Sequence, residues 1–397
     1  MIRTTLRKLL TIALPATLAA GLLAVLLIEV WVRLAWDDSR GRPGFFLSDP
    51  VRGQRLAASY DGWFAGVPAH TNSLGFRDTR EYPLAKSAGT FRILVLGDSV
   101  TFGHGALYET SYPFLLEQRL REWRPDVKWE VWNLGIPGYN TAQELAYLKE
   151  VGGSYAPDLV IVGFFLNDFS GFDPKPNPGV IDRTASAVLR TMQRYVYSTE
   201  LYKRIYLTLR FRLTESKENQ QRLQHLESED ALLGRAGAAD ASEQKLGGFE
   251  RVSDEDVRAF ECRGAGPRGN SDVAAAIRGR SPEFTPWFDA VEGFRALQHA
   301  GKYRIAFFIN MAPDICGGQD RFFDSGTGED NVALLEFLGR DTPAASSWGE
   351  FLYYRPSQMP AAAAHSLGNS NLVKAKALFE FLRDRVLPPL LPAAIAQ

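Results

Sequence analysis

The stretch Phe91–Gly103 places the strongest limit on the fold, because an apolar run ends abruptly at Gly97, just ahead of Ser99. Apart from Arg92, the run is apolar throughout, as expected for a parallel strand that is buried on both faces. The segment Tyr108–Trp123 then carries apolar residues at helical spacing. Ser99 is therefore predicted to lie at a strand-to-helix turn, at the carboxyl edge where open α/β sheets bind their ligands.

On this stretch alone, two interpretations of Ser99 stay open. Asp98 and Ser99 are both common N-terminal caps, so the pair could serve only to begin the next helix. A serine beside the N–H groups of a helix terminus is also well placed for nucleophilic attack. The residues downstream favour the second interpretation.

The strand-to-helix pattern recurs along the chain and predicts a parallel α/β sheet. Apolar runs that break at glycine or at Asn167-Asp168 indicate buried strands, and apolar residues at helical spacing separate them. The elements predicted after the first strand and helix are strands over 129–138, 158–168 and 303–310 and helices over 141–155, 284–300 and 371–386.

Other regions lack this regularity. An irregular lead-in is predicted over residues 37–90. Within it, Thr71–Asp78 is interpreted as a surface turn. From about Thr184 to Leu233 the chain is charged and amphipathic, and its tyrosines could face the core, a membrane surface or a partner. A further irregular region is expected up to Pro360. The predicted division of the chain is 1–36, 37–90, 91–170, 171–282 and 283–397.

The N-terminal segment Leu9–Ile28 is uncharged and apolar, and it is long enough to cross a bilayer as a helix. Basic residues precede it, which predicts a cytoplasmic N-terminus and an exported body. Glu29 and Arg33 follow at a spacing that lets them pair on one helix face. We expect a single-span anchor (residues 1–36); a cleaved signal peptide and a buried core helix are the alternatives.

Composition narrows the classes of function. The 397 residues carry a net charge of −1, so no nucleic-acid partner is expected. The two cysteines, Cys262 and Cys316, allow either one disulfide or two free thiols. No Cys/His cluster has metal-ligand spacing, so neither a metal nor another cofactor is predicted.

Polar or glycine residues follow three predicted strands, and a histidine precedes the last helix. Ester hydrolysis through an acyl-enzyme requires a nucleophile, a base and donors for the oxyanion. Ser99 and His365 supply the first two. The N–H groups of Ser99 and Gly138 and the Asn167 side-chain amide supply the donors, and glycine at 138 lets the backbone approach a substrate closely.

These residues resemble those of the SGNH hydrolases, the GDSL-type esterase/lipase superfamily. Four blocks of that family occur in order: Gly97-Asp98-Ser99, Asn133–Gly138, Asn167-Asp168 and His365–Asn369. The resemblance covers residues 91–170 and 283–390. It implies a flavodoxin-like three-layer α/β/α fold with a parallel central sheet, and an oxyanion hole formed by Ser99, Gly138 and Asn167.

The chain departs from the family pattern at Ala362, where the family has an aspartate three residues before the histidine. Loss of the acid from a serine-protease triad lowers turnover by about 10⁴. Three explanations stay open: a backbone carbonyl orients His365, another acid replaces the aspartate, or the protein binds without efficient turnover. The acids nearest in sequence are Asp314, Asp320, Asp324 and Asp341.

Taken together, the sequence predicts a serine esterase anchored in a bacterial inner membrane, with its body in the periplasm. The resemblance implies a substrate with an ester-linked acyl group, such as O-acetyl, on an envelope or exported carbohydrate or lipid, and envelope polysaccharide machinery as a partner. Asp98 is expected to brace the turn, Asp168 to support the Asn167 loop, and His104 to line the pocket. The alternatives are an O-acyltransferase or a catalytically impaired protein that binds glycan or an assembly partner.

Overall fold

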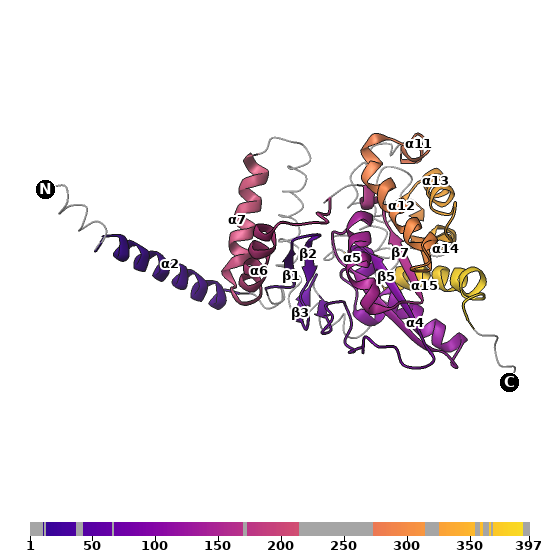
Figure 1. Cartoon of the computed structure of the whole chain (residues 1–397), viewed down its shortest axis with the longest axis horizontal. Coiled ribbons are helices and arrows are strands. Elements are labelled where there is room, and N and C mark those ends of the chain that lie inside the picture. Colours follow the sequence, from indigo (N-terminus) through magenta and orange to yellow (C-terminus); the bar gives the residue numbers. More distant parts are fainter. Residues whose placement is uncertain are drawn as a thin grey trace.

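The fold is organised around a central β-sheet (Figure 1). The computed structural model describes residues 11, 13–36, 43–65, 67–169, 173–213, 273–313, 325–353, 358–359, 365–366 and 368–391. The strands of the central sheet are β5 (Thr90–Gly97), β6 (Lys128–Gly135), β7 (Leu159–Phe164), β8 (Ile305–Ile309) and β11 (Ala344–Ser346). All pair in parallel, in the order β11-β8-β7-β5-β6. Numbered along the chain this is the order 2-1-3-4-5, which is that of flavodoxin-like folds.

Helices cover both faces of this sheet. On one face, α4 (Tyr112–Trp123) and α15 (Gly368–Phe381) bury apolar residues against the odd-numbered positions of β5, Ile93 and Val95. On the other face lie α5 (Thr141–Tyr155), α12 (Thr285–His299) and α13 (Gly328–Leu338), packed against Leu94 and Leu96. This confirms the predicted three-layer α/β/α fold with a parallel central sheet.

Short elements complete the described chain. The helical turns are α3 (Ser99–Phe102), η3 (Tyr108–Thr110), η4 (Leu166–Phe169), α11 (Val273–Arg278), η6 (Pro282–Phe284), α14 (Trp348–Phe351) and the π-helical η8 (Leu382–Val386). The two-residue strands are β9 (Ala312–Pro313), β10 (Ser325–Gly326), β12 (Gln358–Met359) and β13 (His365–Ser366).

The lead-in was predicted to be irregular, but it forms two antiparallel hairpins. The first pairs β1 (Phe46–Asp49) with β2 (Gly53–Leu56), and the second pairs β3 (Asp61–Phe64) with β4 (Val67–His70). Each strand has only four residues, so it is too short to show a clear alternation of apolar and polar side chains. Phe45, Leu56 and Ala69 are buried in the same core as the sheet.

The region before Pro360, also predicted to be irregular, contains α13 and the fifth strand of the sheet. The fifth strand, β11, lacks the apolar run that identified the others, because its sequence is Ala-Ala-Ser. It pairs with β8 in the register Ala344↔Phe307, at the edge of the sheet. An edge strand with small side chains leaves almost no trace in the sequence.

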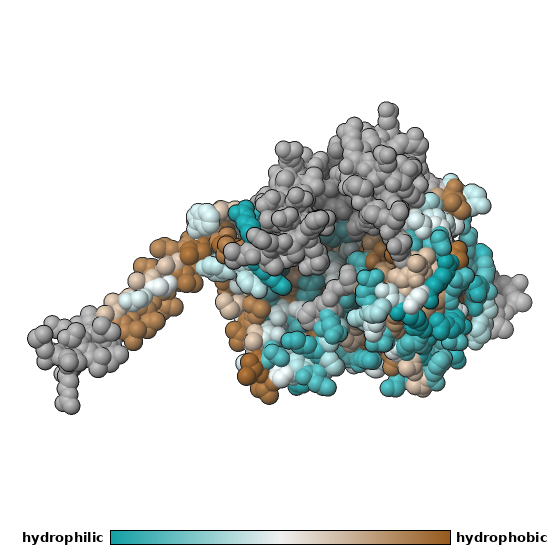
Figure 2. Space-filling view, turned by 90° about the horizontal axis from the view of Figure 1, so that it is seen from above, coloured by the Kyte–Doolittle hydropathy of each residue, from teal (hydrophilic) through white to brown (hydrophobic). Residues whose placement is uncertain are grey.

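The N-terminal helix α2 (Leu14–Leu34) is, within the described residues, long and apolar enough to cross a membrane. Most of its surface is exposed and hydrophobic (Figure 2). Length and composition fit a membrane anchor and a signal sequence equally well. Arg33 Nε donates to Glu29 Oε1 at 2.6 Å, so the expected pair does form on one helix face.

Two helices follow η4, at the start of the predicted helical insertion. They are α6 (Val180–Tyr195) and α7 (Ser198–Leu213). The rest of the predicted amphipathic region, residues 214–233, lies outside the described residues, as do Cys262 and Cys316. In Figure 1, α6 and α7 lie on the side of the body from which α2 projects.

Candidate active site

Ser99 is held at the first position of the short helix α3, which follows the inner strand β5. The Asp98 side chain caps this helix, because its Oδ1 accepts the Val100 N–H at 2.8 Å. Gly103 ends the helix in the left-handed conformation, with φ of 79°. The Ser99 side chain is mostly buried, with 7% of its surface exposed.

The three predicted oxyanion-hole residues follow three neighbouring strands at one edge of the sheet. Gly97, at the end of β5, pairs in register with Gly135 of β6 on one side and with Gly163 of β7 on the other. Ser99 therefore follows the middle strand. Gly138 and Asn167 follow the two strands beside it, since the carboxyl ends of parallel strands meet at one edge.

Glycines lie at or next to the ends of these strands, and because glycine has no side chain, α3 can lie directly on the sheet. A Cβ atom at Gly135 would come within 2.3 Å of the Phe102 backbone nitrogen. Cβ atoms at Gly97 and Gly163 would come within 2.0 and 2.5 Å of Thr101 Oγ1. Real Cβ atoms do not approach so closely, so the position of the nucleophile turn depends on glycine at these positions.

Asn133 fixes the same turn from β6. Its Nδ2 donates to the carbonyl oxygen of Thr101 at 2.9 Å, while its Oδ1 accepts the Gly135 N–H at 3.0 Å. Gly138, three residues after Gly135, has φ of 80°, which lies in the left-handed region that glycine adopts readily. The asparagine therefore connects the serine turn to the loop that carries Gly138.

His365 reaches Ser99 from a segment 266 residues away in the chain. Its Nε2 lies 2.8 Å from Ser99 Oγ, and the residue is buried, with 8% of its surface exposed. The strand pair β12–β13 holds it in the register Met359↔His365. If Nε2 accepts the serine proton, the proton of the neutral ring must reside on Nδ1.

His104 stacks on the ring of His365. The two ring centroids are 4.2 Å apart and the ring planes differ by 17°. Phe64, from the second hairpin, contacts the His104 ring edge-on at 4.8 Å. The stack fixes the plane of the His365 ring. The sequence placed His104 near the pocket but gave no sign of this contact.

Three carboxyl groups are buried together at the end of the sheet: Asp98, Glu144 and Asp168. Burial, then the negative charges of Asp168 and Asp98, raise the pKa of Glu144 well above its usual range. Burial and the charge of Asp98 raise the pKa of Asp168 in the same way. Asp168 Oδ2 also accepts the Phe165 N–H at 3.0 Å, which holds the loop that carries Asn167.

The interpretation of Thr71–Asp78 as a surface turn is wrong. Arg77 is completely buried, and its guanidinium donates to the carbonyl oxygens of Phe102, Gly103 and Ala106 at 2.6 to 2.7 Å. Burial lowers its pKa to about 10, so it remains charged at neutral pH. A buried arginine that satisfies three carbonyl groups fixes the loop on which His104 lies.

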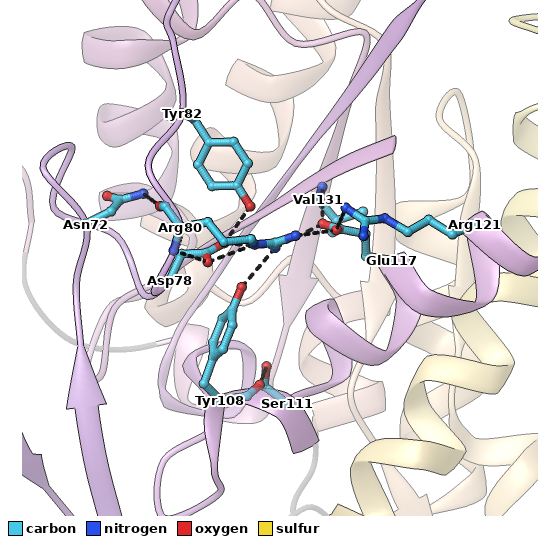
Figure 3. A network of polar contacts seen from close by, with 9 residues as sticks. All are labelled: Asn72, Asp78, Arg80, Tyr82, Tyr108, Ser111, Glu117, Arg121 and Val131. Carbon is cyan, nitrogen blue, oxygen red and sulfur yellow. Dashed lines mark hydrogen bonds and ion pairs between the residues drawn. The ribbon is translucent and has the colours of Figure 1, made fainter. Parts of the chain in front are cut away.

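A second buried network continues from the same segment (Figure 3). Asp78 accepts hydrogen bonds from the Arg80 guanidinium and from the Tyr82 hydroxyl. Arg80 Nη1 also donates to Glu117 of α4 at 2.5 Å, and Glu117 accepts the Val131 N–H of β6 at 2.9 Å. The lead-in is thereby connected to a helix and a strand of the central fold.

The acid that would normally orient His365 is not identified among the described residues. Ala362, Asp314, Asp320 and Asp324 lie outside them. Asp341 precedes β11 and therefore lies at the amino edge of the sheet, opposite the edge that carries Ser99. This position rules out Asp341 as the replacement. No group of three or more potential ligands in the described residues could hold a metal ion.

Comparison with known proteins agrees with the predicted family. Residues 95–238 match the model of the GDSL-like lipase/acylhydrolase family, a range that includes Ser99, Gly138 and Asn167 and ends before His365. An arylesterase of Vibrio mimicus is 39% identical over 92 residues, which are 23% of this chain and 45% of that protein. The chain thus spans about half the length of this curated relative.

The solved structures that match this chain include two carbohydrate esterases. One is a two-domain esterase active on acetylated mannans, with 12% identity, coverage of 75% of this chain and 50% of that one, and a TM-score of 0.35. The other is a carbohydrate esterase family 2 enzyme with a carbohydrate-binding domain from Corynascus thermopiles, with 10% identity, coverage of 77% and 70%, and a TM-score of 0.35. Residues 95–238 of the chain thus match the GDSL-like lipase/acylhydrolase family model, and the parallel sheet and the four sequence blocks agree with that match.

Proposed function

We propose that the protein is a serine esterase in which Ser99 is the nucleophile and His365 the general base. The observation that carries the proposal is the 2.8 Å contact between Ser99 Oγ and His365 Nε2, formed at the carboxyl edge of the sheet. A nucleophile within hydrogen-bond reach of its base is the arrangement that acyl transfer requires. The family of the domain and the arylesterase relative support an ester substrate.

In the acylation step, Ser99 Oγ attacks the ester carbonyl carbon while its proton passes to His365 Nε2. The carbonyl oxygen becomes an oxyanion, which accepts hydrogen bonds from the N–H groups of Ser99 and Gly138 and from Asn167 Nδ2. The tetrahedral intermediate collapses as the carbon–oxygen bond to the alcohol breaks. The departing alkoxide takes the proton from His365, which leaves an acyl-enzyme.

Deacylation repeats these steps with an acceptor hydroxyl. Water loses a proton to His365 and attacks the acyl carbon, and the proton then returns to Ser99 Oγ as the acid is released. An alcohol in place of water would give acyl transfer instead. The strand pair β12–β13 and the stack with His104 help to hold the His365 ring in place.

The proposed location is a bacterial inner membrane, with α2 as a single-span anchor, the N-terminus in the cytoplasm and the body in the periplasm. The apolar helix and the basic residues ahead of it support this assignment. The proposed substrate is an ester-linked acyl group, such as O-acetyl, on an envelope or exported carbohydrate or lipid. Envelope polysaccharide machinery is the proposed partner.

A second candidate function is glycan or partner binding on a hydrolase scaffold with impaired turnover. Ala362 favours it, because the aspartate of the family pattern is missing there. In this case Ser99 and His365 would remain in contact without supporting measurable hydrolysis. The two candidates differ in one measurable property, which is the dependence of ester turnover on Ser99.

The test is hydrolysis of p-nitrophenyl acetate by the purified full-length chain in detergent. We expect Ser99→Ala and His365→Ala each to lower kcat/KM by several orders of magnitude, because the two groups act as a unit. Ser87→Ala, at an exposed serine ahead of β5, is the matched control and should leave the rate unchanged. Equal rates for the parent chain and Ser99→Ala would contradict the proposal.

A further inference from the structure

Helix α6 turns its polar side toward the protein. Gln193 Oε1 accepts the Ser48 N–H of β1 at 2.7 Å, and Arg190 Nη1 donates to the Ser48 carbonyl oxygen at 3.1 Å. The Ser186 and Ser48 hydroxyls also lie 3.2 Å apart. No residue of α6 is buried. The contact of this helix with the body is therefore made by polar groups, the reverse of an ordinary surface helix.

The apolar side of α6 consequently faces outward. Its large apolar residues are between 43% and 84% exposed: Val180, Ile181, Val188, Leu189, Met192 and Tyr195. At 100° per residue these positions occupy one half of the helix circumference. An amphipathic helix oriented in this way leaves its apolar side without a protein partner in the described part of the chain.

Helix α7 carries a second exposed apolar stripe. Its exposed residues Tyr202, Ile205, Tyr206 and Leu209 are spaced i, i+3, i+4 and i+7, which places them on one stripe of the helix. Between Ser198 and Leu213 the chain also has four basic residues and one acidic residue. We call these four residues, together with the six of α6, the outer apolar face.

The outer apolar face begins at the end of the candidate membrane span. Glu29 of α2 accepts the N–H groups of Tyr197 and Ser198, at 3.0 and 2.8 Å, at the junction of α6 and α7. Arg33 Nη2 donates to the Tyr195 carbonyl oxygen at 2.7 Å. In Figure 2, hydrophobic patches lie among hydrophilic ones on the side of the body from which α2 projects.

We propose that the outer apolar face rests on the surface of a lipid bilayer whose hydrocarbon core α2 crosses. Helices with one apolar side and basic polar residues bind in the headgroup region of bilayers, with preference for anionic lipids. The continuity with α2 favours a bilayer over a protein partner. The inference rests on the membrane anchor of the proposed function and is independent of the esterase activity.

One consequence concerns access to the site. A cavity of about 520 Å³ lies at the junction of α2, α7 and the hairpins, and Trp31, Trp36, Phe45, Phe64 and Arg204 are among the residues that line it. Phe64 also contacts His104, which stacks on His365. The rings of Phe64 and His104 therefore separate this cavity from His365.

The test uses the full-length chain in liposomes of phosphatidylcholine and phosphatidylglycerol, with Cys262 and Cys316 replaced by serine. An environment-sensitive fluorophore is attached in separate variants at Val188→Cys and Leu209→Cys, and at Glu122→Cys as the control on exposed α4. We expect nitroxide-labelled lipids to quench the fluorophores at positions 188 and 209, and to leave the one at 122 unquenched.

Two results would overturn the proposal. The fluorophores at 188 and 209 would show solvent-like emission and no quenching if the face is exposed to water. They would show blue-shifted emission that nitroxide lipids do not quench if a second copy of the chain, or residues 214–272, covers the face. The readout needs no turnover, so Ser99→Ala should give the same quenching, which separates this inference from the proposed esterase activity.

Discussion

Glu144 is a fully buried carboxyl group beside Asp98 and Asp168, close to the turn that carries the nucleophile. Neither of its side-chain oxygens has a hydrogen-bond partner among the described residues. In the unfolded chain this group has an ordinary pKa near 4.5, whereas in the folded protein its pKa is raised. At a pH between these two pKa values, Glu144 is ionised in the unfolded chain and still protonated in the folded protein. The free energy of unfolding therefore falls as the pH rises through this range.

We expect Glu144→Gln to stabilise the protein, because the amide has nearly the same shape and no charge to bury. The gain should be large at pH 8 and shrink toward pH 4.5, since each unit of raised pKa corresponds to about 1.4 kcal/mol. Thermal unfolding of both proteins at the two pH values measures this difference. A gain that is independent of pH would show that the carboxyl group is ionised in the folded state.

Replacement of Arg77 is expected to lower the stability of the protein. Arg77→Met would leave three buried carbonyl groups, those of Phe102, Gly103 and Ala106, without their donor. We expect a loss of stability of about 3 kcal/mol or more, as for other broken buried networks, and a lower kcat at temperatures where the variant is still folded. Denaturant unfolding measures the first effect and ester turnover the second. Arg385→Met, at an exposed position, should change neither.

The residues that perform the proposed chemistry were more visible in the sequence than those that hold them. Ser99 and Asn167 each follow an apolar run, and that pattern predicts a position at the sheet edge. Arg77 and Glu144 follow no such pattern. Their burial depends on contacts with segments more than 20 residues away, so local sequence could not distinguish them from surface charges.

At the scale of elements, glycine decides how closely α3 approaches the sheet. Gly135→Ala would bring a Cβ atom against the Phe102 backbone nitrogen, which cannot move without displacing the nucleophile turn. We expect this variant to lose about 1–3 kcal/mol of stability, as when a well-packed core is overfilled, and to lose its esterase activity. Activity and thermal unfolding measured on the same preparation test both expectations.

Gly153, on the exposed side of α5, provides the matched control. A Cβ atom there would meet no atom within 4 Å, and alanine favours a helix over glycine by about 1 kcal/mol. Gly153→Ala should therefore stabilise the protein and leave activity unchanged. A similar effect of alanine at both positions would contradict the role assigned to the bare strand end at Gly135.

Most of the longer helices and strands were predicted, but helix α13 and the shortest strands were missed. Helix α5 spans Thr141–Tyr155, the range that the sequence predicted, because it is long and begins with a capping box at Asn140. Strand β11 and the two hairpins were missed, because strands of three or four residues lack a measurable period. Their pairing becomes evident only once the longer strands are in place.

At the scale of the whole molecule, the fold joins segments that are far apart in the sequence. His365 meets Ser99 across 266 positions, and the lead-in contributes Phe64 and Arg77 to the surroundings of that pair. The family blocks predicted the meeting of serine and histidine. They could not predict the orientation of α6, because its amphipathic pattern is the same whether its apolar side faces the core or the outside.

The central claim is that Ser99 is an activated nucleophile despite the alanine at position 362. The most direct measurement is the intact mass of the full-length chain after incubation with a fluorophosphonate, beside Ser99→Ala. We predict one phosphonyl adduct on the parent chain and none on the variant, because the probe reacts with a serine whose proton a neighbouring base removes. A folded parent chain that acquires no adduct, or a variant that acquires the same one, would contradict the account.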